Sequence, residues 1–236
     1  MTNKEFSAKY EDLMKRYEAY GRQWLRDNGY ESRATFNRDG IKNTDKWFAT
    51  GNEFRPLFVL SEVHDEEFLL EEKTERFVDG ENTDFDKGEL TWRKIVSLSR
   101  GLKIAQETNE TAEYKLFSGD DEYQEYLNDI AVINLKKFSG GRNIGSDKSK
   151  STGVYNLHIN DGFTALLEEQ IALINPTMIV CCGGNIFDLL KNNVKLGTRM
   201  IIKGYHPRAR VSIKKYYDCI VEEFKKTCHS TNNAEN

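Results

Sequence analysis

The stretch Pro176-Thr177-Met178-Ile179-Val180-Cys181-Cys182-Gly183-Gly184-Asn185 carries the pattern that decides the fold class. Residues 178–182 are a continuous apolar run after a proline, which is typical of a strand buried on both faces. Two glycines follow at once and predict a tight turn into a helix. The same glycines are compatible with backbone N–H groups that bind a phosphate at the helix N-terminus, and the sequence alone leaves both interpretations open.

The pattern repeats on both sides of this stretch. Further apolar runs at 56–60, 130–134 and 199–202 also predict buried strands. Apolar residues recur at helical spacing at 4–28, 90–102, 161–173, 186–190 and 212–226. Buried strands that alternate with helices predict an α/β fold, a three-layer α/β/α sandwich around a central parallel sheet of about four strands.

No Gly/Ser-rich spacer divides the 236 residues, and only three are proline. We therefore predict one domain with additions at its ends. Residues 1–54 are expected to form an N-terminal helical extension, 55–228 the α/β/α domain and 229–236 a disordered tail.

No apolar run reaches the roughly 20 residues that span a bilayer, and the first residues lack the apolar core of a secretory signal. The four cysteines lack the spacing of zinc or iron–sulfur ligands, and Cys181 and Cys182 lie in a predicted buried strand. We expect a cytoplasmic protein with no membrane partner, no metal, no other cofactor and no obligatory protein partner.

The net charge of −4 is unevenly distributed. Acidic residues dominate from Glu62 to Glu89, whereas basic residues dominate from Lys136 to Lys150 and from Lys203 to Lys226. Local charge decides where a polyanion can bind. The basic segments indicate either a nucleic-acid surface or solvated loops.

Polar residues follow each predicted strand, and in open parallel sheets ligands bind outside the carboxyl ends of the strands. These segments are Glu62–Glu67, Asn134–Arg142, Gly183–Asn185 and His206–Arg210. The chain has no P-loop, no dinucleotide-binding G-x-G-x-x-G after a strand, no G-x-S-x-G and no H-E-x-x-H. Taken singly, Glu62 is compatible with a solvated acid, Asn134 with a strand-end cap and His206 with a turn residue.

Together, the acidic residues after the first strand, Asn134 after the second and His206-Pro207 after the fourth resemble the uracil-DNA glycosylase superfamily. The resemblance covers Pro56 to Lys226 and includes Leu173 to Gly184. It implies a DNA glycosylase that flips a base out of DNA and excises it, which is a base-excision repair activity.

The resemblance assigns roles to particular residues. Catalysis falls to His206 and to a carboxylate among Glu62, Asp65 and Glu67, because bond cleavage leaves positive charge on the sugar and negative charge on the departing base. Reading of the flipped base falls to Asn134, with His64 and Phe138 beside it. Contacts with the DNA backbone fall to Lys136, Lys137, Arg142, Arg208 and Arg210.

The sequence also departs from the family. The first loop reads Ser61-Glu62-Val63-His64-Asp65 where the family has a Gly, a polar residue and a Pro, and Arg208 follows His206-Pro207 where a Ser is usual. The pattern is closest to the family 4-like branch, but Phe138 stands where its iron–sulfur members carry a cysteine. Some members act in phage defence on bulky modified cytosines, so we expect uracil or a modified cytosine as the substrate base.

Two other functions fit the same residues. A hydrolase of free nucleosides or nucleotides uses similar carboxylate and histidine chemistry, but it does not need the basic segments. A non-catalytic DNA-binding module on this fold is compatible with the altered loop at Ser61–Asp65.

Overall fold

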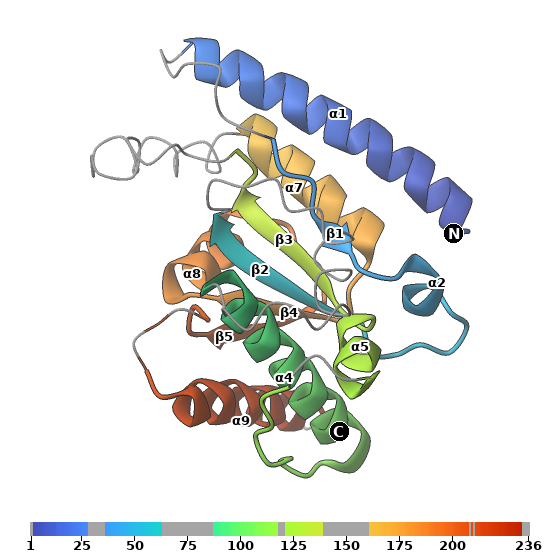
Figure 1. The fold of residues 1–236 in the computed structure, drawn as a ribbon. Coiled ribbons are helices and arrows are strands. Elements are labelled where there is room, and N and C mark those ends of the chain that lie inside the picture. Colours follow the sequence, from blue (N-terminus) through green and yellow to red (C-terminus); the bar gives the residue numbers. More distant parts are fainter. Residues whose placement is uncertain are drawn as a thin grey trace.

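Four parallel strands form the centre of the sheet, and a short antiparallel strand extends one side (Figure 1). The computed structural model describes residues 2–27, 36–62, 87–117, 121–138, 161–207, 209 and 211–232. The strands are β1 (Gly40–Ile41), β2 (Pro56–Glu62), β3 (Ala131–Lys136), β4 (Met178–Cys182) and β5 (Met200–Gly204). Their order is β1-β3-β2-β4-β5. The predicted fold class is confirmed.

Helices cover both faces of this sheet (Figure 1). One face carries α4 (Lys87–Thr108), α5 (Asp121–Leu127) and α9 (Ile213–Asn232), and the other carries α2 (Thr44–Trp47), α7 (Asp161–Ile174) and α8 (Gly184–Asn193). Helix α1 (Asn3–Asp27) lies outside α7 and packs on it.

Strand side chains alternate between the two faces, as the period of a β-strand requires. In β2, Phe58 and Leu60 join the core under α4 and α9, whereas Leu57 and Val59 join the core under α7 and α8. All four are buried. The continuous apolar runs of the sequence therefore reflect burial on both sides.

Residues 36–54 belong to the sheet and its core, which differs from the predicted extension. Strand β1 pairs with β3. Trp47 is fully buried, and its indole N–H donates to the Ile174 carbonyl at 2.7 Å. The sequence pattern did not reveal this contribution because β1 has only two residues and α2 only four.

Three further boundaries differ from the sequence prediction. Helix α5 lies between residues 102 and 130, where no element was predicted. Strand β3 continues through Asn134 to Lys136. Helix α9 extends to Asn232, so residues 229–232 are helical and the predicted disordered tail is wrong there. No helix in the described ranges has the length and apolar character that crossing a bilayer requires.

Candidate active site

The four parallel strands end at one edge of the sheet, where β2 ends at Glu62 and β5 at Gly204. Glu62 pairs with Lys136 of β3, and Cys182 of β4 pairs with Gly204. Along the chain, β3 forms on one side of β2 and β4 on the other. Such a change of direction, here between β2 and β4, is where open α/β sheets bind ligands. This edge is therefore the candidate site.

Several predicted site residues lie outside the described part of the chain: His64, Asp65, Glu67, Arg142, Arg208 and Arg210. For Glu62 the structure describes the backbone, which is paired with Lys136 at the end of β2. The acidic residues of the first loop therefore follow a strand that ends at the candidate edge.

Asn134 lies within β3 opposite Leu60, two residues before the strand ends, and it is buried. Its backbone N–H donates to Asp39 Oδ2 at 2.6 Å, and its Nδ2 lies 3.4 Å from the same oxygen. Asp39 immediately precedes β1. Its carboxylate therefore bonds to β3 beside the start of β1. Asn134 is thus a fixed residue of the sheet.

Asp39 is the centre of a buried polar cluster that links α1, α7 and the sheet. Its Oδ1 accepts from Lys137 Nζ at 2.6 Å and from Gln170 Nε2 at 3.1 Å. The Tyr10 hydroxyl donates to the Asp39 backbone carbonyl at 2.5 Å. Burial lowers the pKa of Lys137, and the Asp39 carboxylate opposes that shift. A buried ion pair needs such additional partners because both charges have lost their hydration.

The position of Lys137 differs from its predicted role as a DNA-backbone contact. Its side chain is fully buried, with the ammonium on Asp39 and 5.5 Å from the Tyr17 ring centroid. Lys136 is also buried, with 8% of its surface exposed. In this arrangement Lys137 has no ammonium surface to offer a phosphate.

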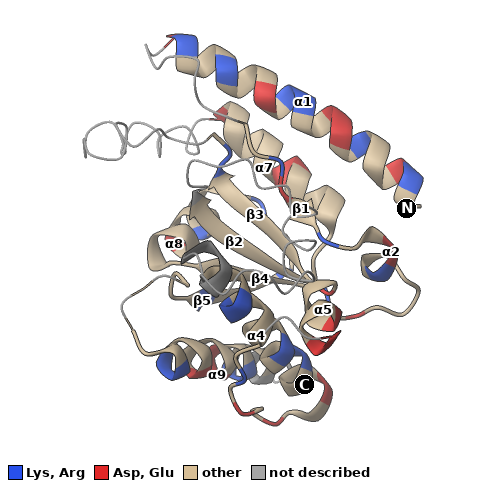
Figure 2. Cartoon of the chain, in the orientation of Figure 1, with Lys and Arg blue, Asp and Glu red and all other residues tan. Residues whose placement is uncertain are grey.

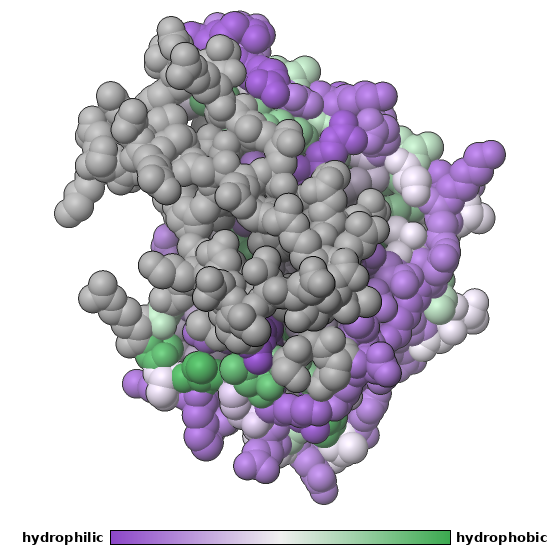
Figure 3. Space-filling view, in the orientation of Figure 1, coloured by the Kyte–Doolittle hydropathy of each residue, from purple (hydrophilic) through white to green (hydrophobic). Residues whose placement is uncertain are grey.

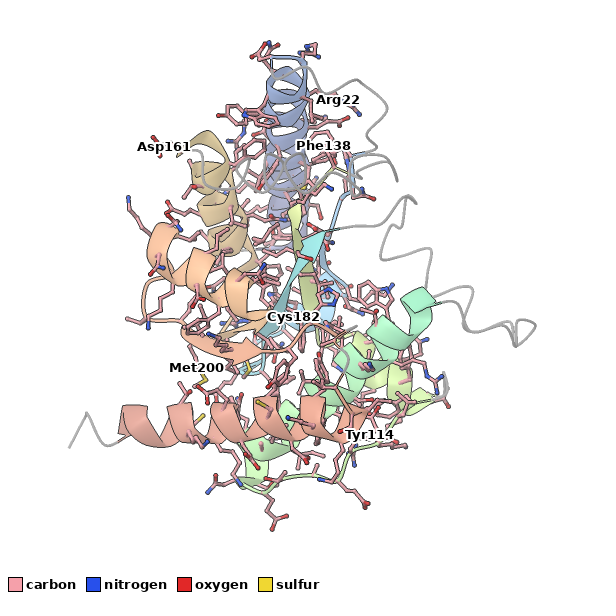
Figure 4. All side chains as sticks on the ribbon, turned by 90° about the vertical axis from the view of Figure 1, so that its left-hand side faces the viewer. Arg22, Tyr114, Phe138, Asp161, Cys182 and Met200 are labelled. Carbon is pink, nitrogen blue, oxygen red and sulfur yellow. The ribbon has the colours of Figure 1, made fainter. Side chains whose placement is uncertain are left out.

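Phe138 also differs from its predicted role beside a flipped base. Its ring is 2% exposed and packs against Phe36, with ring centroids 5.2 Å apart. Helix α1 covers it: a Cβ at Gly21 would lie 2.1 Å from Phe138 Cε2, and the Arg22 guanidinium lies 5.7 Å from the ring centroid. Figure 4 shows Phe138 next to α1, close to Arg22 of that helix. Phe138 is a core residue because α1 occupies the space that a base would need.

His206 lies two residues after β5 in a tight turn, and it is partly buried. The Ala209 N–H donates to the His206 carbonyl at 2.8 Å. The Pro207 carbonyl accepts from Lys94 Nζ of α4 at 2.6 Å. A local bond and a bond from α4 thus both contribute to holding the turn that carries His206.

Lys94 is a buried cation, 6% exposed, and burial lowers its pKa. Its Nζ lies 6.0 Å from the ring centroid of Tyr216 on α9. No motif in the sequence marks this residue, although its position in the chain contains a signal. Lys94 stands four residues before Leu98 and eight before Leu102, so it occupies the apolar stripe of a predicted helix.

The Gly183-Gly184 turn acts as a strand-to-helix connection. Gly183 has φ +147, a conformation that side chains disfavour, and its N–H donates to the Cys181 carbonyl at 2.9 Å. Helix α8 begins at the next residue. The glycine pair therefore forms the tight strand-to-helix turn that was one of its two interpretations.

Asn134 and His206 share the edge without touching. Their strands are separated by β2 and β4, which corresponds to about 14 Å between backbones at the usual strand spacing. Within the described ranges, no group of three or more His, Cys, Asp or Glu side chains is arranged to hold a metal ion. Because Asn134 and His206 lie this far apart, a site that uses both residues spans the ends of several strands.

A scan against protein-family models found no match to this chain, and a search of curated proteins found none either.

Proposed function

We propose that the protein is a DNA glycosylase that excises uracil or a modified cytosine and leaves an abasic site. One observation carries the proposal: β2, β3 and β5 end at the same edge of the sheet, and there Glu62 closes β2, Asn134 lies near the end of β3 and His206 follows β5. They flank the change of direction between β2 and β4, where this type of sheet binds ligands.

The proposed reaction is hydrolysis of the N-glycosidic bond. The bond between the sugar and the base breaks with its electron pair going to the base, and a water oxygen forms the new bond to the sugar. A carboxylate from Glu62, Asp65 or Glu67 stabilises the developing positive charge and orients the water. His206 donates a hydrogen bond to the departing base as negative charge develops there. Proton transfer from the water to the base balances the reaction.

Asn134 is proposed to read the base edge. A carboxylate only accepts hydrogen bonds, so Asp39 favours the amide orientation with Nδ2 toward it and Oδ1 away from it. Uracil and cytosine derivatives both carry an N–H donor that suits such an acceptor. Asp39 is then a positioning residue for Asn134, a role that no sequence motif revealed.

The decisive experiment offers the protein DNA that carries uracil, hypoxanthine, thymine mismatches or modified cytosines. Alkali-labile abasic sites on one of these substrates are the expected result. Free nucleosides form a second set of substrates. Strand scission without base release, or no abasic site on any substrate, contradicts the proposal.

A nucleoside hydrolase is the second candidate, and the burial of Lys136 and Lys137 favours it because two predicted DNA contacts are withdrawn from the surface. Salt separates the two functions. A DNA glycosylase loses affinity steeply as salt rises, since binding releases condensed counterions. Arg208→Ala and Arg210→Ala are expected to flatten that dependence. Release of bases from free nucleosides at a salt-independent rate would establish the second candidate.

A further inference from the structure

Lys94 has an unusual combination of charge and surroundings. It lies on the core-facing side of α4, and its ammonium is bonded to a backbone carbonyl, that of Pro207. Among the residues that the structure describes, no ion pair joins Lys94 to a carboxylate. Removing an ammonium from water without an anionic partner is costly. An apolar residue of similar length would fill the space without that cost.

The hydrogen bond from the Lys94 ammonium falls on the turn that carries His206. Pro207 is buried, so its carbonyl needs a donor from the protein, and Lys94 Nζ supplies it at 2.6 Å. The bond from the Ala209 N–H to the His206 carbonyl, by contrast, is local. The bond from Lys94 therefore fixes the turn relative to the sheet and its helices.

Lys94 brings together α4, the turn after β5 and α9. Its helix, α4, shares a core with β2 and β4, and its ammonium lies near the Tyr216 ring of α9. Cys182, the last residue of β4, belongs to the same core (Figure 4). Because Lys94 bonds to this turn, the turn is held in a fixed position relative to β2 and β4, the strands that border the proposed base pocket.

We propose that Lys94 is a positioning residue, which holds His206 at the carboxyl edge of the sheet by donating from its ammonium to the Pro207 carbonyl. This inference rests on the proposed glycosylase function for its catalytic consequence, but the positioning of His206 is testable without any activity. A misplaced catalytic group costs rate even where the fold is intact, with a displacement of about 1 Å worth on the order of 10²-fold.

The test compares Lys94→Met, Lys94→Arg and the control Lys103→Met. Lys103 lies on the same helix, but its ammonium pairs with Asp129 at 3.0 Å and makes no bond to the turn after β5. Methionine has an unbranched side chain one atom shorter than that of lysine, and it removes the donor. Arginine keeps a donor and the charge.

On a confirmed DNA substrate, Lys94→Met is expected to slow the single-turnover rate by on the order of 10²-fold, with DNA affinity unchanged. Lys94→Arg should recover part of that loss, and Lys103→Met should react like the parent protein. Equal rates for Lys94→Met and Lys103→Met, or a loss of DNA affinity that accounts for the whole effect, would overturn the proposal.

An NMR measurement separates this inference from the proposed function. The ring ¹H–¹⁵N signals of His206, assigned by their loss in His206→Ala, should shift in Lys94→Met and stay in place in Lys103→Met. If no substrate is found and the shift still occurs, the glycosylase function fails and the positioning role stands. If the signals of His206 are unchanged in Lys94→Met, the positioning role fails. Should Lys94→Met not fold, Lys94→Gln, whose shorter and uncharged side chain cannot keep the ammonium on the Pro207 carbonyl, takes its place in the same comparison.

Discussion

His206 and Asn134 are held in different ways, and their substitutions should differ accordingly. Replacing His206 by Ala removes an interaction made mainly in the transition state, so the single-turnover rate should fall by a factor on the order of 10²–10³ while DNA affinity changes little. Replacing Asn134 by Ala should slow the reaction and also change which base is accepted. Rapid-quench assays on two competing substrates measure both effects. Near-normal rates in both variants would place the chemistry elsewhere.

The Asp39–Lys137 pair should show the energetics of a buried ion pair. Lys137→Met leaves the Asp39 carboxylate buried with Gln170 and Asn134 as its remaining donors. Breaking such a pair from one side typically costs about 3–5 kcal/mol, and the double variant Asp39→Leu/Lys137→Met should recover much of that loss. Urea unfolding of the parent, both single variants and the double variant completes the cycle. Additive losses would show that the two charges do not interact.

The exposed charges of α1 contribute little to the packing of this helix on α7. Acidic and basic residues alternate along its outer side (Figure 2), and the surface along it is hydrophilic (Figure 3). Exposed pairs such as Arg16–Asp12 contribute little to stability. The buried side, with Leu13, Met14 and Tyr17, carries the packing.

At Gly21 a substitution by alanine should change the stability of the protein in the direction opposite to the usual one. A Gly-to-Ala change inside a helix ordinarily stabilises by roughly 1 kcal/mol. At Gly21, however, the added Cβ would lie 2.1 Å from the Phe138 ring. We expect Gly21→Ala to destabilise the protein by about 1–3 kcal/mol because the ring or the helix must move.

Thermal or urea unfolding of Gly21→Ala measures this effect, and Ala19 offers a matched control. It stands two residues earlier on the same helix on an exposed face, so Ala19→Gly should cost only the helix propensity. A stabilising Gly21→Ala would mean that α1 does not press on Phe138.

At the scale of the whole molecule, buried acids that ionise at high pH predict alkaline unfolding. Burial raises the pKa of Cys181 to about 12, and that of Tyr217 also to about 12. Burial raises the pKa of Tyr17 as well. The folded state then keeps protons that the unfolded chain loses from about pH 9 for thiols and about pH 10 for phenols. The contribution of these groups to stability should therefore be constant below about pH 9 and be lost as pH rises toward about 12.

Two measurements check this prediction. The urea midpoint should decrease steadily above about pH 9. The absorbance of ionised tyrosine should show fewer of the eleven tyrosines titrating near pH 10 in the native protein than in urea. Identical tyrosine titrations in the two states would refute the proposed burial.

The four parallel strands and the edge at which they end were both predictable from the sequence. A strand buried on both faces must be apolar throughout, so residues 56–60 and 178–182 stand out against their polar surroundings. Parallel strands share one carboxyl edge, so the polar residues that follow them were expected together. These inferences depend on local composition and on the geometry of the backbone.

The roles of individual side chains at that edge were decided by tertiary structure. Lys137 and Phe138 follow β3 in a polar, basic stretch, yet α1 and Asp39 enclose both of them. Asp39 and Lys94 are single charges without a motif, and each acquires a partner far along the chain, Lys137 and Pro207 respectively. Burial and pairing depend on which distant segments pack together, and a local pattern of residue types contains no information about that choice.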